Sequence, residues 1–333
     1  MTNLIFYNKN LKEGLDLKVN ESKFLKLLIF SMFYMVLLNG AYALNDKTNY
    51  TIYEDLNKNS INIGVALLNG KSEELVYVNG KKLSELTWEL ENVPMFGLEV
   101  ERKLASKTYL NISAWTKLAN GSGEMNDYDW LDESGSWTHH SNHKTNLEKA
   151  YMLNLNVEYE LLHNKNHNFS TSIGFRHDRF KWEAYDGEGT YLNSDVIFYG
   201  KGITYDQKLY APYIGLDFNY KKNSWSVNMY LRGSFWAWGE ATDVHHSPAY
   251  SLDGVYYPSG EERTFKDNIS DIDYLSYGVK LNYFMREDIL IGLAFDFQDY
   301  LKSKGEGEIN GVTYDAGLSH YSYMISMMTE YRF

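Results

Sequence analysis

Two short polar segments of this 333-residue chain carry acidic and imidazole side chains two residues apart. Asp127 and Asp129 form one pair, and Asp243 and His245 form the other. Because residues i and i+2 of an extended strand point to the same face, we expect the members of each pair to lie side by side. Two close carboxylates resist joint ionisation, so one of them should hold a proton. An aspartate beside a histidine orients the imidazole and raises its basicity, as a general base requires.

Taken alone, these two pairs are a weak indication of catalysis. Asp-x-Asp and Asp-x-His also arise by chance in acidic loops, as solvated groups or as ligands of calcium or another metal ion. If the two pairs face one another, a water molecule between them could be activated for hydrolysis. The chain has no cysteine, which excludes disulfides and thiolate metal sites.

The overall charge limits the class of partner. The net charge is −12, which argues against a nucleic-acid partner because phosphate binding needs a basic face. An acidic surface attracts cationic substrates, although it also simply favours solubility.

The segments that must position the two pairs show a two-residue hydrophobic period. In 151–161, for example, apolar side chains occupy the odd positions and asparagine or glutamate most of the even ones. The runs 225–235 and 275–283 and the last dozen residues show the same alternation, where a helix would show a period of 3.6. The 29 tyrosines, 16 phenylalanines and 8 tryptophans, with only 4 prolines, suit long strands with aromatic girdles. A soluble sandwich would also alternate, but its apolar face would be less aromatic.

Ten such runs can be counted along the chain, near 60–68, 84–99, 106–118, 150–161, 168–182, 203–220, 224–240, 263–285, 288–302 and 318–333. Short polar turns near 105–107, 163–167, 221–223 and 286–288 separate them in alternation with long polar segments near 69–83, 119–149, 184–202, 241–262 and 303–317. This pattern predicts an all-β fold, a ten-stranded antiparallel transmembrane β-barrel. We expect the short turns on the periplasmic side and the long loops on the extracellular side of a bacterial outer membrane.

The amino-terminal part predicts export. Lys23 and Lys26 precede an apolar run over 27–38, and Ala41-Tyr42-Ala43 follows as a cleavage site. The run is too short for a spanning helix, which needs roughly 20 apolar residues. We therefore divide the chain into a leader at 1–43 and one barrel domain at 44–333.

The segment around the first pair resembles the omptin family of bacterial outer-membrane proteases. The most specific residues are Asp127-Tyr128-Asp129-Trp130-Leu131-Asp132, followed by Gly135-Ser136-Trp137-Thr138, Ser141 and His143. Gly70-Lys71-Ser72 with Glu74, Arg179-Phe180, Gly189-Thr190-Tyr191 and Ala211-Pro212-Tyr213 resemble other family segments, so the resemblance spans about 60–333.

The resemblance implies an endopeptidase that uses water and neither a metal nor a covalent intermediate. It matches Asp127, Asp129, Asp243 and His245 to the catalytic residues. It matches Glu74, at the base of a pocket for a basic side chain, and Met125 and Ile203, which line the pocket, to substrate-binding residues. It also matches Arg179 and Lys208 to outer-wall cations that bind activating lipopolysaccharide, although without the family they read equally well as ordinary interfacial side chains.

The chain departs from the family pattern at several positions. The family's second acidic pocket residue has no clear counterpart, and Ala241 or Glu240 stands near its place. His246 follows His245, so either imidazole could serve as the base. The alternative function is a non-catalytic omptin-like barrel, an adhesin, surface binding protein or pore. A lipid-modifying barrel hydrolase would need a serine–histidine site on the lipid-facing wall, and none is convincing in the sequence.

Overall fold

The computed structural model describes residues 59–121 and 123–333, and within these ranges all regular structure is β-strand. The predicted leader at 1–43 lies outside the described residues. No helix in the described ranges is long and apolar enough to cross a membrane. Thirteen strands follow in the order β1 (Ser60–Val78), β2 (Lys81–Ala105), β3 (Thr108–Lys117), β4 (Glu124–Asp129), β5 (His139–His163), β6 (His167–Tyr191), β7 (Ser194–Lys222), β8 (Trp225–His245), β9 (Ala249–Leu252), β10 (Val255–Tyr257), β11 (Arg263–Phe284), β12 (Ile289–Ile309) and β13 (Val312–Arg332).

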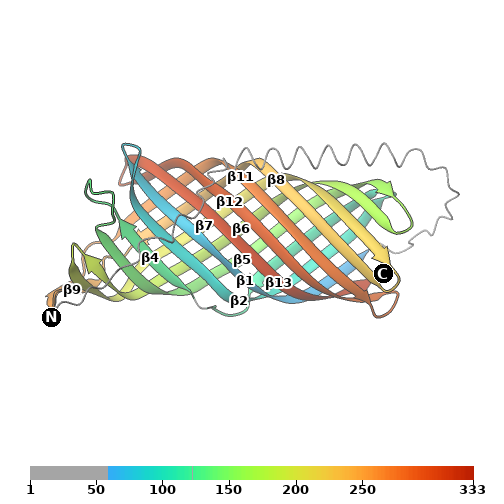
Figure 1. Cartoon of the computed structure of the whole chain (residues 1–333), viewed down its shortest axis with the longest axis horizontal. Helices are drawn as coiled ribbons and strands as arrows, with labels where there is room; N and C mark the ends of the chain where they lie inside the picture. Colours follow the sequence, from blue (N-terminus) through green and yellow to red (C-terminus); the bar gives the residue numbers. More distant parts are fainter. Residues whose placement is uncertain (1–58, 122) are drawn as a thin grey trace, which may run out of the picture. The chain divides into compact units, whose positions relative to one another are not determined.

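The strands close into a barrel in which every neighbour is antiparallel (Figure 1). β1 pairs with β2 on one side and with β13 on the other, which joins the first strand to the last. β3 and β4 occupy one position between β2 and β5, and β9 and β10 form a small hairpin beside β7. The ring therefore has ten strand positions, which confirms the predicted ten-stranded barrel. Closure leaves no free edge in the ring, so backbone groups are paired between neighbouring strands.

The predicted short turns are present, but most of the predicted long loops are strands. β1 continues to Val78, β6 to Tyr191 and β12 to Ile309, and each then reverses in a two-residue turn. In the ranges that the structure describes, the connections 130–138 and 246–262 remain long, and the second contains the β9–β10 hairpin. The prediction was wrong here because these strand extensions carry polar side chains on the outer face and glycine or mixed side chains on the inner one, so the alternation that identified the strands fades.

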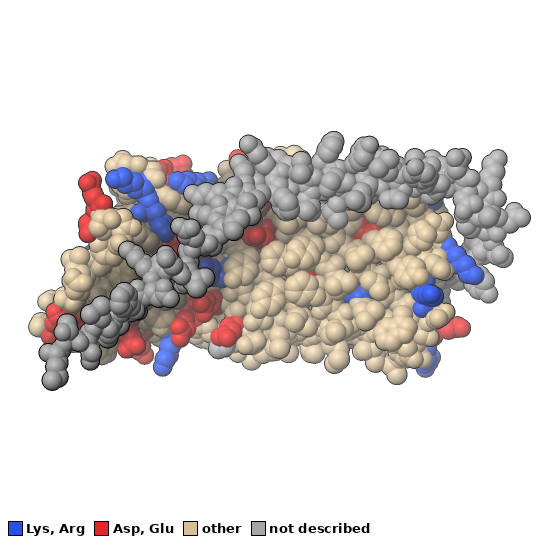
Figure 2. All heavy atoms as spheres, viewed as in Figure 1, with Lys and Arg blue, Asp and Glu red and all other residues tan. Residues whose placement is uncertain are grey.

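The outer wall carries a band of apolar side chains toward the short-turn end of the barrel. In Figure 2, lysine, arginine, aspartate and glutamate gather at the end where β4 and β9 lie and are sparse on the wall between the ends. The most exposed apolar residues of this band include Ile63, Val65, Leu67, Leu155, Ile173, Ile214, Leu293 and Met327. A band of this kind matches the hydrocarbon core of a membrane. The two catalytic pairs predicted above lie beyond it, at the opposite end.

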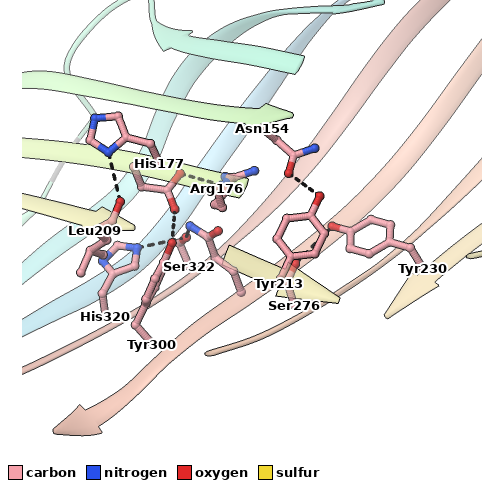
Figure 3. Close-up of polar contacts among 12 residues, drawn as sticks. Asn154, Arg176, His177, Leu209, Tyr213, Tyr230, Ser276, Tyr300, His320 and Ser322 are labelled. Carbon is pink, nitrogen blue, oxygen red and sulfur yellow. Dashed lines mark hydrogen bonds and ion pairs between the residues drawn. The ribbon is translucent and has the colours of Figure 1, made fainter. Parts of the chain in front are cut away.

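The interior of the barrel is filled by side chains. At the level of the band, Tyr300 and Arg176 donate hydrogen bonds of 3.0 and 2.7 Å to Asp178, and Tyr213 donates one of 2.7 Å to Asn154 (Figure 3). Above them lies a layer of fully buried rings, in which Trp88 stacks on Tyr205 with centroids 5.3 Å apart and Trp182 and Phe180 pack beside them. Because side chains fill the cross-section of the barrel, the alternative function as a pore is disfavoured. The same packed layer supports the residues that lie above it.

Candidate active site

The aspartate pair lies on β4, a short strand held between two others. Asp127 is opposite Leu86 of β2 and Ser141 of β5, and Asp129 is opposite Ser84 and His139. The two carboxylates thus share one face, as the i, i+2 spacing predicted. The Ser84 hydroxyl hydrogen-bonds to both carboxylates, and Oδ1 of Asp127 is sealed from solvent and has no hydrogen-bond donor among the described residues.

The aspartate–histidine pair ends β8, between β7 and β11. Asp243 is opposite Tyr205 and Phe265, and its side chain is only 3 % exposed. Nε2 of His245 lies 2.6 Å from Oδ2 of Asp243, while about a third of the imidazole is open to solvent. The predicted contact is therefore present, and it fixes the ring by one nitrogen and leaves the other available.

The charges of the two pairs shift one another's pKa values across the end of the barrel. Burial, together with the charge of Asp129, raises the pKa of Asp127 to about 7, although His245 opposes the rise. Burial alone would lower the pKa of His245, but the charge and hydrogen bond of Asp243, helped by Asp127 and Asp129, raise it above the usual value. Burial also raises the pKa of Asp129. Strands that are far apart in the chain thus place all four groups around one space, where a carboxyl group keeps a proton near neutral pH.

His246 points to different partners from His245. Its Nε2 lies 2.9 Å from Oγ1 of Thr204, its Nδ1 lies 2.8 Å from Oε2 of Glu262, and its backbone N–H donates to the carbonyl of Gly202. Because both nitrogens of this imidazole are engaged, His246 fastens the start of the long connection to β7. His245 is the histidine that faces the aspartate pair.

The three predicted substrate-binding residues lie below and beside the four polar groups. Met125 is on the same face of β4 as the aspartates and is fully buried, and Ile203 is the register partner of His245 and is 6 % exposed. Glu74, on β1, is 2 % exposed. Burial, with the charges of Asp243 and Asp267, raises the pKa of Glu74 well above its usual value.

Arg179 and Lys208 are register partners on β6 and β7. They alternate with Asp178, Phe180, Gln207 and Leu209, which are completely buried inside, so the two cations face outward. Arg179 donates to both oxygens of Asp206 at 2.8 and 2.6 Å, and Lys208 lies 3.8 Å from Glu240. Glu240 thus lies on the outer wall beside Lys208. Ala241 is the inward-facing neighbour.

Several residues near the site were not predicted as site residues from the sequence. They are Ser84, Tyr191, Asp267 and Tyr314. Burial raises the pKa of Tyr191, and the negative charges of the nearby Asp127 and Asp129 raise it further. Asp267 on β11 is 4 % exposed and accepts a 2.6 Å hydrogen bond from Tyr314 of β13. Each depends on the register between strands, which no local sequence pattern reports. Among the described residues, no group of three or more histidine, aspartate and glutamate side chains is placed to hold a metal ion.

Comparison with known proteins agrees with this arrangement. The model of the Omptin family matches residues 55–333. The chain belongs to the omptin family. It is 30% identical to the plasminogen activator of Yersinia pestis over 284 residues, which cover 80% of this chain and 87% of that protein. It is 29% identical to the outer membrane protease IcsP of Shigella flexneri over 252 residues, or 72% and 76% of the two chains.

The fold of this omptin is also that of a solved structure. The crystal structure of the outer membrane protease OmpT from Escherichia coli matches with a TM-score of 0.76 and 24% sequence identity, covering 86% of this chain and 99% of that one. This likeness shows the fold, whereas the family match and the curated relatives identify the protein as a protease of the bacterial outer membrane, so the prediction of a peptide-bond hydrolase is confirmed.

Proposed function

We propose that this omptin is an endopeptidase that hydrolyses peptide bonds next to basic residues by means of a water molecule held between its two polar pairs. The observation that carries the proposal is the 2.6 Å contact of His245 with the buried Asp243, facing an aspartate pair on another strand. Catalysis by two such pairs needs no covalent intermediate, because water itself is the nucleophile.

His245 acts as the general base. With one ring nitrogen tied to Asp243, the other removes a proton from water as the oxygen attacks the peptide carbonyl. The imidazolium that forms is stabilised by the charge of Asp243, and it returns the proton to the leaving amine. Asp127 and Asp129 share a proton, position the water and donate a hydrogen bond to the developing oxyanion.

Glu74 supports the preference for a basic side chain. It is an acid at the base of the site, and its Oε2 is buried without a hydrogen-bond donor among the described residues. The acids that act on it include Asp243, Asp267 and Asp127, and this negative surrounding favours a lysine or arginine side chain of the substrate.

The site faces the exterior of the cell in this proposal, because outer-membrane barrels carry their longer connections on the extracellular side, and the site lies at the end with the connections 130–138 and 246–262. Arg179 and Lys208 then lie on the outer wall near the extracellular interface, where they bind phosphate of lipopolysaccharide as an activating lipid. The neighbouring Asp206 and Glu240 hold both cations in place until phosphate competes for them.

The experiment uses refolded protein with added lipopolysaccharide and a peptide library, and cleavage sites next to lysine or arginine are expected. His245→Ala should lower turnover at least ~100-fold, the scale of a lost general base, while His246→Ala should keep most of it. Both variants must show the mobility shift of a folded barrel on unboiled gels. The assignment of the base is wrong if His246→Ala abolishes cleavage and His245→Ala does not. Loss of all activity in a chelator would instead indicate a metal site.

A further inference from the structure

Ala241 leaves an open question about how this omptin recognises a cationic side chain. The residue faces inward on β8 and has no charge, so position 241 adds no carboxylate to that of Glu74 on β1. The register partner of Ala241 on the next strand, β11, is Asp267. Register partners on neighbouring strands point to the same face, so a carboxylate enters the interior one strand away from the uncharged position.

Asp267 is built into the interior. It is 4 % exposed, and the hydroxyl of Tyr314 donates to its Oδ1 at 2.6 Å from β13, across the intervening β12. Gly307 of β12 makes this contact possible, since a Cβ there would lie 2.3 Å from the ring of Tyr314 and 2.6 Å from Oδ1 of Asp267. The second oxygen of Asp267 accepts no hydrogen bond from the described residues. One oxygen is thus fixed and the other is free for a ligand.

Glu74, Asp243 and Asp267 form an acidic cluster, each member of which is 4 % exposed or less. Oε2 of Glu74 and Oδ1 of Asp243 are buried and accept no hydrogen bond from the other described residues, and the two carboxyl groups are close enough to share a proton. The groups that act on Glu74 are acids, and those that act on Asp267 are Tyr314 and Asp243. A purely structural cluster would be compensated by a lysine or arginine, because an unpaired buried charge is costly. Asp243 has the imidazole of His245 as its partner, whereas no cationic side chain among the described residues pairs with Glu74 or Asp267.

We propose that Asp267, together with Glu74, binds the cationic side chain of the substrate and is a specificity-determining residue of this omptin. The proposal rests on the endopeptidase function proposed above. Asp267 supplies from β11 the second carboxylate that position 241 on β8 does not supply. A cation entering the cluster meets free oxygens on β1 and β11, and Tyr314 holds the Asp267 carboxylate in place.

The test compares kcat/KM for two matched peptides that carry lysine or norleucine at the cleavage position. Asp267→Asn should lower the lysine-to-norleucine ratio at least about tenfold, the loss expected for one charge-assisted hydrogen bond. The matched control is Glu308→Gln, which removes an acid of the same charge from the exposed surface of β12. It should keep the ratio, since the general acidic field is then almost the same.

A second variant tests the position of the charge. Adding Ala241→Asp to Asp267→Asn returns a carboxylate to the adjacent strand, and the folded double variant should regain most of the lost ratio. A folded double variant that regains none would place the binding carboxylate elsewhere. Asp267 would be merely structural if Asp267→Asn lowered cleavage of both peptides equally, and uninvolved if the ratio stayed unchanged. Failure of the wild type to cleave either peptide would overturn the proposed function itself.

Discussion

Asp127 must keep a proton near neutral pH if the aspartate pair is to donate a hydrogen bond to the oxyanion. Burial and the nearby charge of Asp129 raise its pKa from 3.8 to about 7. A shift of about three units corresponds to about 4 kcal/mol of preference for the neutral form. At pH 7 the protonated fraction then rises from roughly one in a thousand to about half. The surroundings of Asp127 therefore prepare the acid form before substrate arrives.

The perturbation is Asp127→Asn, which keeps an N–H donor in place of the carboxyl proton and cannot lose it. In the wild type, kcat/KM should fall on the alkaline side as Asp127 ionises, by up to tenfold per pH unit. In Asp127→Asn this alkaline fall should be absent, with activity at pH 7 within about tenfold of the wild type. Asp127→Ala, which has no donor, should lose at least ~100-fold at every pH.

The assay is kcat/KM on one basic peptide from pH 5 to pH 10, with gel mobility before and after boiling as the measure of folding. The acid limb should persist in both variants, because it reports protonation of His245. The role assigned to Asp127 is refuted if the asparagine variant is as inactive as the alanine variant at every pH. The negative charge, and not the proton, would then be what the reaction requires.

Other properties of the barrel can be tested on the same variants. The pKa of Asp267 is raised to about 6, so its protonation stabilises the folded state at low pH, and this stabilisation is lost as the pH rises through 6. Asp267→Asn should therefore raise the midpoint temperature of heat unfolding at pH 8 and leave it unchanged at pH 4. Glu74→Gln should reduce cleavage of a lysine peptide by about ten- to a hundredfold and barely change that of a norleucine peptide; an equal fall in both would make Glu74 a structural residue. Replacing Arg179 and Lys208 by alanine should weaken activation by lipopolysaccharide, whereas Lys222→Ala at the other end should not; unchanged activation in the double variant would make them ordinary interfacial side chains. Unboiled protein should migrate anomalously on gels, and a largely helical circular-dichroism spectrum would contradict the barrel.

The barrel was predictable from sequence because lipid and interior impose opposite polarity on successive residues. In 151–161, Leu153, Leu155 and Val157 are exposed while Asn154 and Asn156 are buried, and this pattern can be read without any partner strand. Beyond the membrane band the outer face of a strand is largely polar, so polarity no longer alternates regularly between the two faces. The extensions of β1, β6 and β12 therefore looked like loops, although backbone pairing continues to their tight turns.

From the sequence alone, the candidate site could be predicted only for residues that are close to one another along the chain. The pairs at 127 and 129 and at 243 and 245 share a face because the strand period is two, whatever the neighbours are. Their meeting depends on the closure of the ring, and the resemblance to omptins supplied that expectation. Asp267 could not be found in this way, since its place opposite Ala241 is set by the register of β8 with β11 and by bulges between Ile269 and Tyr274.

The buried acids of the candidate site destabilise the folded state, and the closed barrel below them compensates for this loss of stability. Glu74, Asp127 and Asp267 all have raised pKa values, mainly because burial penalises their charged forms, so each makes the folded state less stable as the pH rises. Such groups are tolerated because they lie beyond the apolar band, on the ends of strands whose pairing is fixed by a closed ring below. Under the proposed function, a cationic side chain of the substrate would relieve the same penalty when it enters. The unfavourable burial of these acids would then contribute to the selectivity for a basic residue, because a neutral side chain cannot relieve it.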